Sequence, residues 1–146
     1  MPQAESLVGQ FREQHDPSAA AGMPAHITLL YPFSLPGEIG EKEIEKLRQC
    51  FTRFEAFDFF LSAMRRFSTE VLYLAPEPDE PFRELTLAIW HRFPETPPYG
   101  AKYSNIVPHL TVADWQTGGR STVSPINLRG LLRENCRSAR LRLESL

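Results

Sequence analysis

Two short stretches of this chain repeat one pattern of residue types. One reads PAHITLL and contains His26 and Thr28, and the other reads VPHLTVA and contains His109 and Thr111. Both are apolar enough to predict β-strands, and a strand turns every second side chain to the same face. Each stretch therefore places an imidazole beside a hydroxyl. Two such pairs facing one another would form a site for proton transfer and anion binding.

These residue types suit a reaction with two proton movements and an anionic centre. Histidine has an ordinary pKa of about 6.5, so it both donates and accepts protons near neutral pH. One histidine can take a proton from an attacking hydroxyl or water while the other gives one to the leaving oxygen. Threonine hydroxyls can donate hydrogen bonds to phosphate oxygens. The set predicts phosphodiester transfer, and it leaves open which histidine is the acid and which the base.

Other catalytic patterns are missing from the sequence. No third metal ligand stands at a useful spacing beside the two histidines, and Asp114, three residues after Thr111, is expected on the opposite strand face. Gly118 and Gly119 lack the following lysine of a Walker motif and the frame of a dinucleotide fingerprint. A nucleophile elbow is also absent. We therefore predict neither a metal nor a cofactor.

Tyrosines lie close in sequence to both motifs. Tyr31 follows the first motif, and Tyr99 and Tyr103 precede the second. Such rings can stack on nucleic-acid bases, which makes all three candidate base-stacking residues. The alternative is that they pack in the core or within their loops. The remaining histidines, His15 and His91, are expected at helix ends rather than in catalysis.

Composition indicates a globular chain of one domain or two tightly joined lobes. Of its 146 residues, 42% are hydrophobic and 23% are charged. The net charge of −2 argues against bulk electrostatic binding of nucleic acid. Residues 116–146 nevertheless carry six arginines against two glutamates. This basic segment either flanks a phosphate-bearing substrate or forms a solvated helix and strand face.

Cysteine usage and hydropathy predict a cytoplasmic protein. The two cysteines, Cys50 and Cys136, cannot build a disulfide framework, so reduced thiols are expected. The first residues, MPQAE, show no signal-peptide pattern. No apolar run approaches the roughly 20 residues that a membrane span needs.

The coarse pattern of elements predicts an α+β fold. A unit of helix, loop, motif and strand occurs twice, which indicates a duplicated, bilobal architecture with antiparallel sheets flanking a central groove and helices outside. Helices are expected at about residues 4–14, 41–54, 81–93 and 126–135, and strands at about 26–31, 57–63, 71–75, 109–113 and 139–143.

The paired motifs, HITL from His26 and HLTV from His109, resemble those of the 2H (two-histidine) phosphoesterase superfamily, in particular its 2′-5′ RNA ligase and cyclic phosphodiesterase branch. The resemblance covers most of residues 4–115. It implies a bilobal α+β fold without metal or nucleotide cofactor, catalysis by His26 and His109, and phosphate binding by Thr28 and Thr111. Members cleave 2′,3′-cyclic phosphates, 2′-5′ linkages or cyclic nucleotides, and some join RNA ends reversibly without ATP.

The chain departs from that family pattern at both ends. The family usually has a strand before the first helix and a fuller final strand or hairpin. We therefore expect a single domain over residues 1–146, with two pseudo-symmetric lobes and short termini. An unpaired sheet edge would favour a homodimer.

Three hypotheses about function follow. The first is a metal-independent phosphodiesterase or reversible ligase that acts on RNA or a nucleotide with a cyclic phosphate. The second is a non-catalytic module that binds RNA ends or nucleotide phosphates. The third is a protein without any nucleic-acid role, in which the motifs are relics in the core.

Overall fold

The computed structural model describes residues 1–34, 36–68, 70–115 and 140–143. Helices and strands alternate irregularly along these residues, as expected for an α+β chain. The elements are α1 (Pro2–His15), α2 (Pro17–Ala20), the 3₁₀ helix η1 (Pro36–Glu38), α3 (Glu41–Phe51), β1 (Phe57–Phe67), β2 (Val71–Glu77), α4 (Glu80–Arg92), the 3₁₀ helix η2 (Pro98–Ala101), β3 (Leu110–Asp114) and β4 (Arg140–Leu143).

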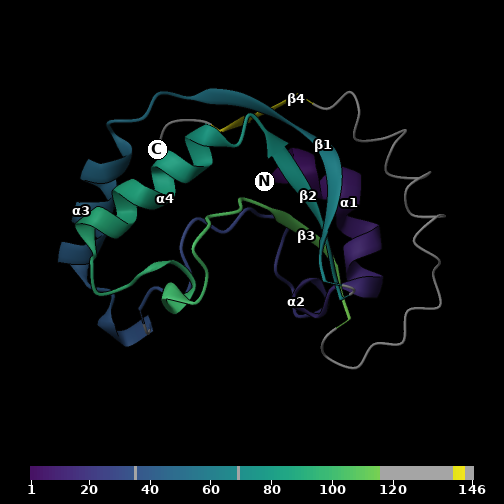
Figure 1. Cartoon of the computed structure of the whole chain (residues 1–146), viewed down its shortest axis with the longest axis horizontal. Helices are drawn as coiled ribbons and strands as arrows, with labels where there is room; N and C mark the ends of the chain where they lie inside the picture. The colour runs from purple at the N-terminus through teal and green to yellow at the C-terminus, as the bar shows by residue number, and fades with distance from the viewer. Residues whose placement is uncertain (35, 69, 116–139, 144–146) are drawn as a thin grey trace. The chain divides into compact units, whose positions relative to one another are not determined.

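The described strands form one sheet in the order β3-β2-β1-β4 (Figure 1). β2 pairs antiparallel with both β1 and β3. Arg65 in β1 lies opposite Tyr73 in β2, and Tyr73 lies opposite Thr111 in β3. Residues directly opposite in antiparallel strands share a face, so these three form a row across the sheet. The antiparallel sheet with its helices confirms the predicted α+β class.

The chain divides into two compact units. The first contains Met1–Ile27, Phe59–Pro78 and His109–Leu141. Within it, α1 packs against β3, and the side chains of Val8, Leu110 and Val112 are buried. Because helical spacing turns one apolar face of α1 toward the strand, this contact forms the core of the first unit.

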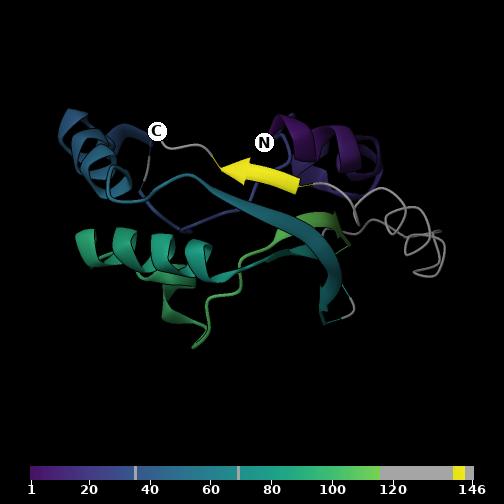
Figure 2. The same cartoon turned by 90° about the horizontal axis from the view of Figure 1, so that it is seen from above.

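The second unit contains Thr28–Asp58, Asp79–Pro108 and Arg142–Leu146. Its two long helices, α3 and α4, lie side by side (Figure 2). Cys50, Ile89 and Phe93 are buried between them, and the ring of Phe33 meets Phe93 edge-on at a centroid distance of 5.0 Å. Burial raises the pKa of the Cys50 thiol, although the charges of Arg53 and Arg92 oppose this shift.

Most elements expected from periodicity are present. The helices α1, α3 and α4 and the strands β1, β2 and β4 lie where the sequence predicts them, to within a few residues. The helix predicted for residues 126–135 lies outside the described residues. The strand predicted for residues 109–113 begins one residue late, so His109 immediately precedes β3 rather than opening it.

The strand predicted over residues 26–31 is wrong, because this stretch has neither helix nor strand geometry. Ala25, directly before this stretch, donates its N–H to the Glu5 carboxylate, and its carbonyl accepts from the N-terminal amine. The carbonyl of Leu29 accepts from the Thr86 hydroxyl at 2.8 Å. The shared strand face that the pattern predicted for His26 and Thr28 is therefore not formed by a strand.

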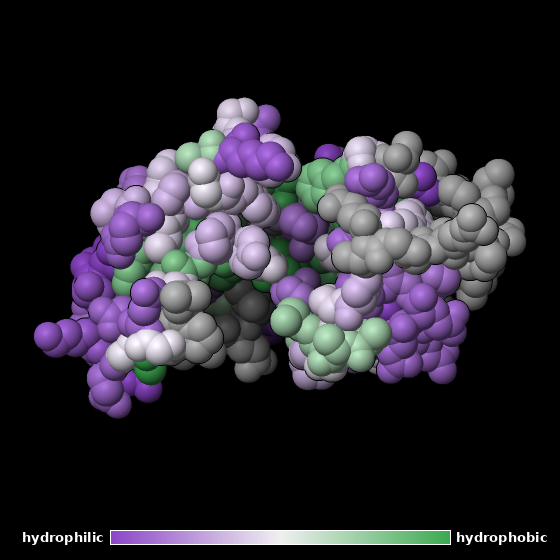
Figure 3. All heavy atoms as spheres, turned by 90° about the horizontal axis from the view of Figure 1, so that it is seen from below, coloured by the Kyte–Doolittle hydropathy of each residue, from purple (hydrophilic) through white to green (hydrophobic). Residues whose placement is uncertain are grey.

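Hydrophilic residues predominate on the face drawn in Figure 3, where hydrophobic residues form separate patches. Among the described helices, none combines the length and apolar character needed to cross a membrane.

Candidate active site

The segment that leads into His26 is held by groups at and near α1. Arg12 donates from Nη1 to the carbonyl of Met23 at 3.2 Å. The Glu5 carboxylate accepts the N–H of Ala25, and the N-terminal amine donates to the Ala25 carbonyl at 3.0 Å. Ala25 itself is completely buried. These contacts fix the backbone directly before His26 without a strand.

A hydrogen bond determines which nitrogen of His26 carries its proton. Nδ1 lies 2.9 Å from the main-chain oxygen of Pro24. Because a carbonyl oxygen only accepts, Nδ1 is the donor, and Nε2 is left to take up or release a proton. The side chain is partly exposed, so a substrate can reach it. This is the arrangement that a general acid or base requires.

His109 is packed against two aromatic rings. Its ring centroid lies 4.9 Å from that of Phe67 and 5.4 Å from that of Tyr73, with both contacts edge-to-face. Phe67 and Tyr73 in turn stack on one another at 4.2 Å. Such contacts restrict the orientation of the imidazole, while His109 itself remains partly exposed.

Thr111 shares its surroundings with His109, because the Tyr73 that contacts His109 is the cross-strand partner of Thr111. On the other side of Tyr73 lies the exposed Arg65. Burial raises the pKa of the Tyr73 phenol, and the charge of Arg65 offsets part of that shift. The phenol is therefore neutral near pH 7, and Arg65 supplies positive charge on the face that carries Thr111.

Arg12 connects the backbones around both motifs. Its guanidinium is 1% exposed and pairs with Asp16 at 2.9 Å. Besides its bond to Met23, it donates from Nε to the main-chain oxygen of Thr111 at 3.1 Å. One buried side chain therefore joins the segment before His26 to the strand after His109. Both predicted histidines belong to the first unit.

The three predicted stacking tyrosines come together in the second unit. The N–H of Tyr99 donates to the carbonyl of Tyr31 at 2.6 Å, and the rings of Tyr99 and Tyr103 meet edge-on at 5.8 Å. Tyr31 and Tyr103 are 67% and 60% exposed, so both rings are open to a ligand. Tyr99 is partly buried, and burial raises its pKa. Its ring contacts the ring of Tyr103 within the same loop.

Thr28 is the first residue of the second unit, where its side chain is partly exposed.

In the part of the chain that the structure describes, no three His, Cys, Asp or Glu side chains are grouped to hold a metal ion.

Sequence reasoning missed the residues that support the motifs. Arg12 contacts residues 11 and 99 positions away, and nothing in its neighbourhood in the sequence indicates those partners. Arg65 and Tyr73 could have been found only with the strand register, which places them beside Thr111.

An α+β chain with two His-x-Thr motifs fits the class of 2H phosphoesterases. The family model described as the 2′-5′ RNA ligase superfamily matches residues 1–133, and the chain belongs to this superfamily, which is the 2H phosphoesterase superfamily. This confirms the resemblance drawn from the motifs. No curated protein matches the chain.

Proposed function

We propose that this protein is a metal-independent phosphodiesterase that acts on 2′,3′-cyclic phosphates or 2′-5′ linkages of RNA or nucleotides, with ligation of RNA ends as the reverse of 2′-5′ linkage cleavage to a cyclic phosphate. The observation that carries the proposal is the double attachment of Arg12. In a chain of the 2′-5′ RNA ligase superfamily, one guanidinium bonds to the segment before His26 and to the strand after His109. This anchoring supports a catalytic role for both histidines.

The proposed hydrolysis requires two coupled proton transfers. One histidine, neutral at the start, takes a proton from water as the water oxygen forms a bond to phosphorus. The bond from phosphorus to one ribose oxygen of the cyclic phosphate breaks, and the other histidine, protonated at the start, gives its proton to that oxygen. The product is a phosphomonoester. At His26, Nε2 is the nitrogen that exchanges the proton, since Nδ1 donates to Pro24.

Charge develops on the non-bridging phosphate oxygens in the transition state. We propose that the hydroxyls of Thr28 and Thr111 donate hydrogen bonds to these oxygens. Arg65, which shares the sheet face of Thr111, adds a positive charge that favours an anionic substrate.

The test is hydrolysis of 2′,3′-cyclic nucleotides in excess chelator. We expect turnover by the wild-type protein, and a loss of about 10²–10⁴-fold in His26→Ala and in His109→Ala. His91→Ala, which changes an exposed histidine in the last turn of α4, is the matched control and should retain activity. Full activity in either motif variant would contradict the proposal. Binding of a cyclic-phosphate-ended oligonucleotide without turnover would assign the non-catalytic alternative.

A further inference from the structure

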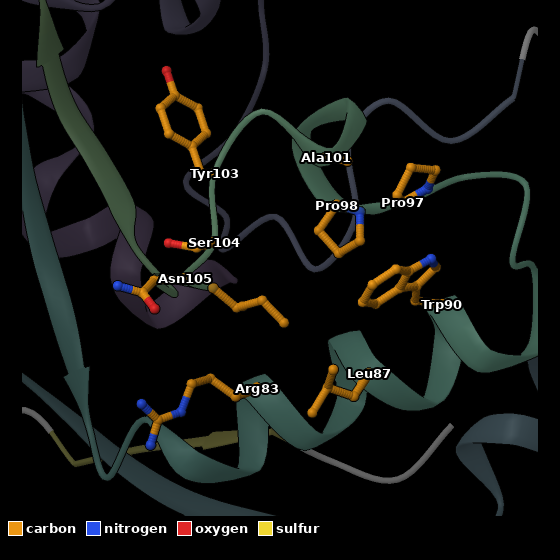
Figure 4. A pocket seen from close by; sticks show the side chains of 10 residues that line it. Arg83, Leu87, Trp90, Pro97, Pro98, Ala101, Tyr103, Ser104 and Asn105 are labelled. Carbon is orange, nitrogen blue, oxygen red and sulfur yellow. The ribbon is translucent and has the colours of Figure 1, made fainter.

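The second unit contains a cavity that the proposed chemistry does not use. It has a volume of about 430 Å³ and lies between α4 and the segment of residues 97–106 (Figure 4). Volumes of this order are typical of sites for small organic ligands. The last lining residue, Ile106, precedes His109 by three positions in the chain.

One side of the cavity is apolar. Leu87 and Trp90, three residues apart on α4, face the segment that carries Pro98 (Figure 4). Pro97, Ala101 and Ile106 complete this lining. Leu87 is 39% exposed and Trp90 is partly exposed, so both can contact a ligand. The indole of Trp90 presents a flat apolar face, which suits a planar ring better than a flexible chain.

The other side of the cavity is polar, and its charged lining residue, Arg83, is paired with carboxylates. Ser104 and Asn105 line it together with Arg83. The guanidinium of Arg83 lies 3.3 Å from Asp79 and 3.8 Å from Glu80, so its charge is already paired. Asparagine both donates and accepts hydrogen bonds, and serine does the same. This lining favours an uncharged ring with hydrogen-bonding edges over a phosphate.

We infer that this cavity of the second unit binds a nucleobase. The inference rests on the proposed function, in which the substrate is RNA or a nucleotide. Trp90 is the ring on which the base stacks, and Asn105 contacts its edge. Tyr103, which also lines the cavity, borders the same site. The sequence predicted tyrosines as the base-stacking residues, whereas this inference gives the main stacking role to Trp90 on α4.

The first experiment uses adenosine, which has no phosphate, so binding is measured without any reaction. In NMR spectra of the full chain, adenosine should shift the indole N–H signal of Trp90 saturably, and Trp90→Phe assigns that signal. We expect Trp90→Ala to weaken adenosine binding by about ten- to a hundredfold, the range expected for loss of one base-stacking contact. Ile44→Ala, which truncates an exposed apolar side chain on α3 of the same unit, should bind adenosine like the wild type.

A second variant covers the case in which Trp90→Ala fails to fold. Leu87→Glu places a charge at an exposed cavity position and should abolish adenosine binding while the protein stays folded. An unshifted Trp90 signal, or wild-type affinity in a folded Trp90→Ala or Leu87→Glu protein, would overturn the inference. A larger shift of the Trp90 signal with inorganic phosphate than with adenosine would do the same.

The two proposals can fail separately. Adenosine binding that depends on Trp90, in a protein that does not hydrolyse cyclic nucleotides, would support the cavity assignment and reject the catalytic one. Histidine-dependent hydrolysis, with adenosine binding unaffected by Trp90→Ala, would support the catalytic proposal and reject the cavity assignment.

Discussion

Arg12 Nε in α1 donates a hydrogen bond of 3.1 Å to the main-chain oxygen of Thr111 in β3, a residue 99 positions away in sequence. The same guanidinium pairs with Asp16, and neither side chain is more than 4% exposed. A charge removed from water in this way is tolerated only while its partners remain in place. The stability of the first unit and the placement of the motifs therefore depend on the same contact.

Replacing Arg12 by methionine should destabilise the protein strongly. The change leaves the Asp16 carboxylate buried without its cation and removes a donor from the carbonyls of Met23 and Thr111. We expect a loss of about 3–5 kcal/mol in the free energy of unfolding, measured by urea denaturation. Arg48→Met is the control, because Arg48 and its partner Glu45 are largely exposed, and it should cost less than about 1 kcal/mol. Equal losses of unfolding free energy in the two variants would show that the buried Arg12–Asp16 pair stabilises the protein no more than an exposed pair does.

Replacing Thr111 by valine should lower turnover much more than stability. Valine keeps the branched shape but lacks the hydroxyl that we propose to bind a phosphate oxygen. By analogy with the removal of one oxyanion donor, kcat for a 2′,3′-cyclic nucleotide should fall by about 10²–10³-fold.

Two companion variants test this explanation. Thr111→Ser restores the hydroxyl and should recover most of the activity. Thr52→Val removes an exposed hydroxyl that donates to the nearby main-chain oxygen of Gln49 and should leave kcat unchanged. Unchanged turnover in Thr111→Val would remove Thr111 from the proposed phosphate site.

Tyr73 should make the folded protein less stable at alkaline pH. Burial raises the pKa of its phenol above the unfolded value of about 10, so the folded state holds this proton more tightly. The stabilisation is fully present below about pH 10 and is lost as pH rises through the higher folded pKa. The free energy of unfolding should therefore fall above about pH 10.

Comparison with Tyr73→Phe isolates this phenol, because the two proteins differ only in the Tyr73 hydroxyl. We expect a shallower alkaline fall in Tyr73→Phe, and a still shallower one when Tyr99, whose pKa burial also raises, is replaced as well. The measurement is urea denaturation over the alkaline range, with values near pH 8 as the internal reference. Identical pH profiles for the wild type and Tyr73→Phe would refute this assignment.

Several features follow from short-range sequence patterns. Apolar residues at helical spacing predicted α3 and α4, and apolar, aromatic-rich runs predicted β1 and β2, because these patterns record which face of an element is buried. The doubled His-x-Thr motif is by itself enough to indicate the superfamily, and the family model over residues 1–133 confirms that placement.

Only the tertiary structure decided how the motif segments are held. Local pattern predicted a strand at His26, but a strand needs a neighbouring backbone. Here Glu5 and the N-terminal amine hold Ala25, directly before the segment, and the Thr86 hydroxyl donates to the carbonyl of Leu29 within it. The link from Arg12 to Thr111 likewise joins residues far apart in the chain. Periodicity within an element reports which side is buried, whereas a contact such as that from Arg12 to the Thr111 backbone is set only when distant segments pack together.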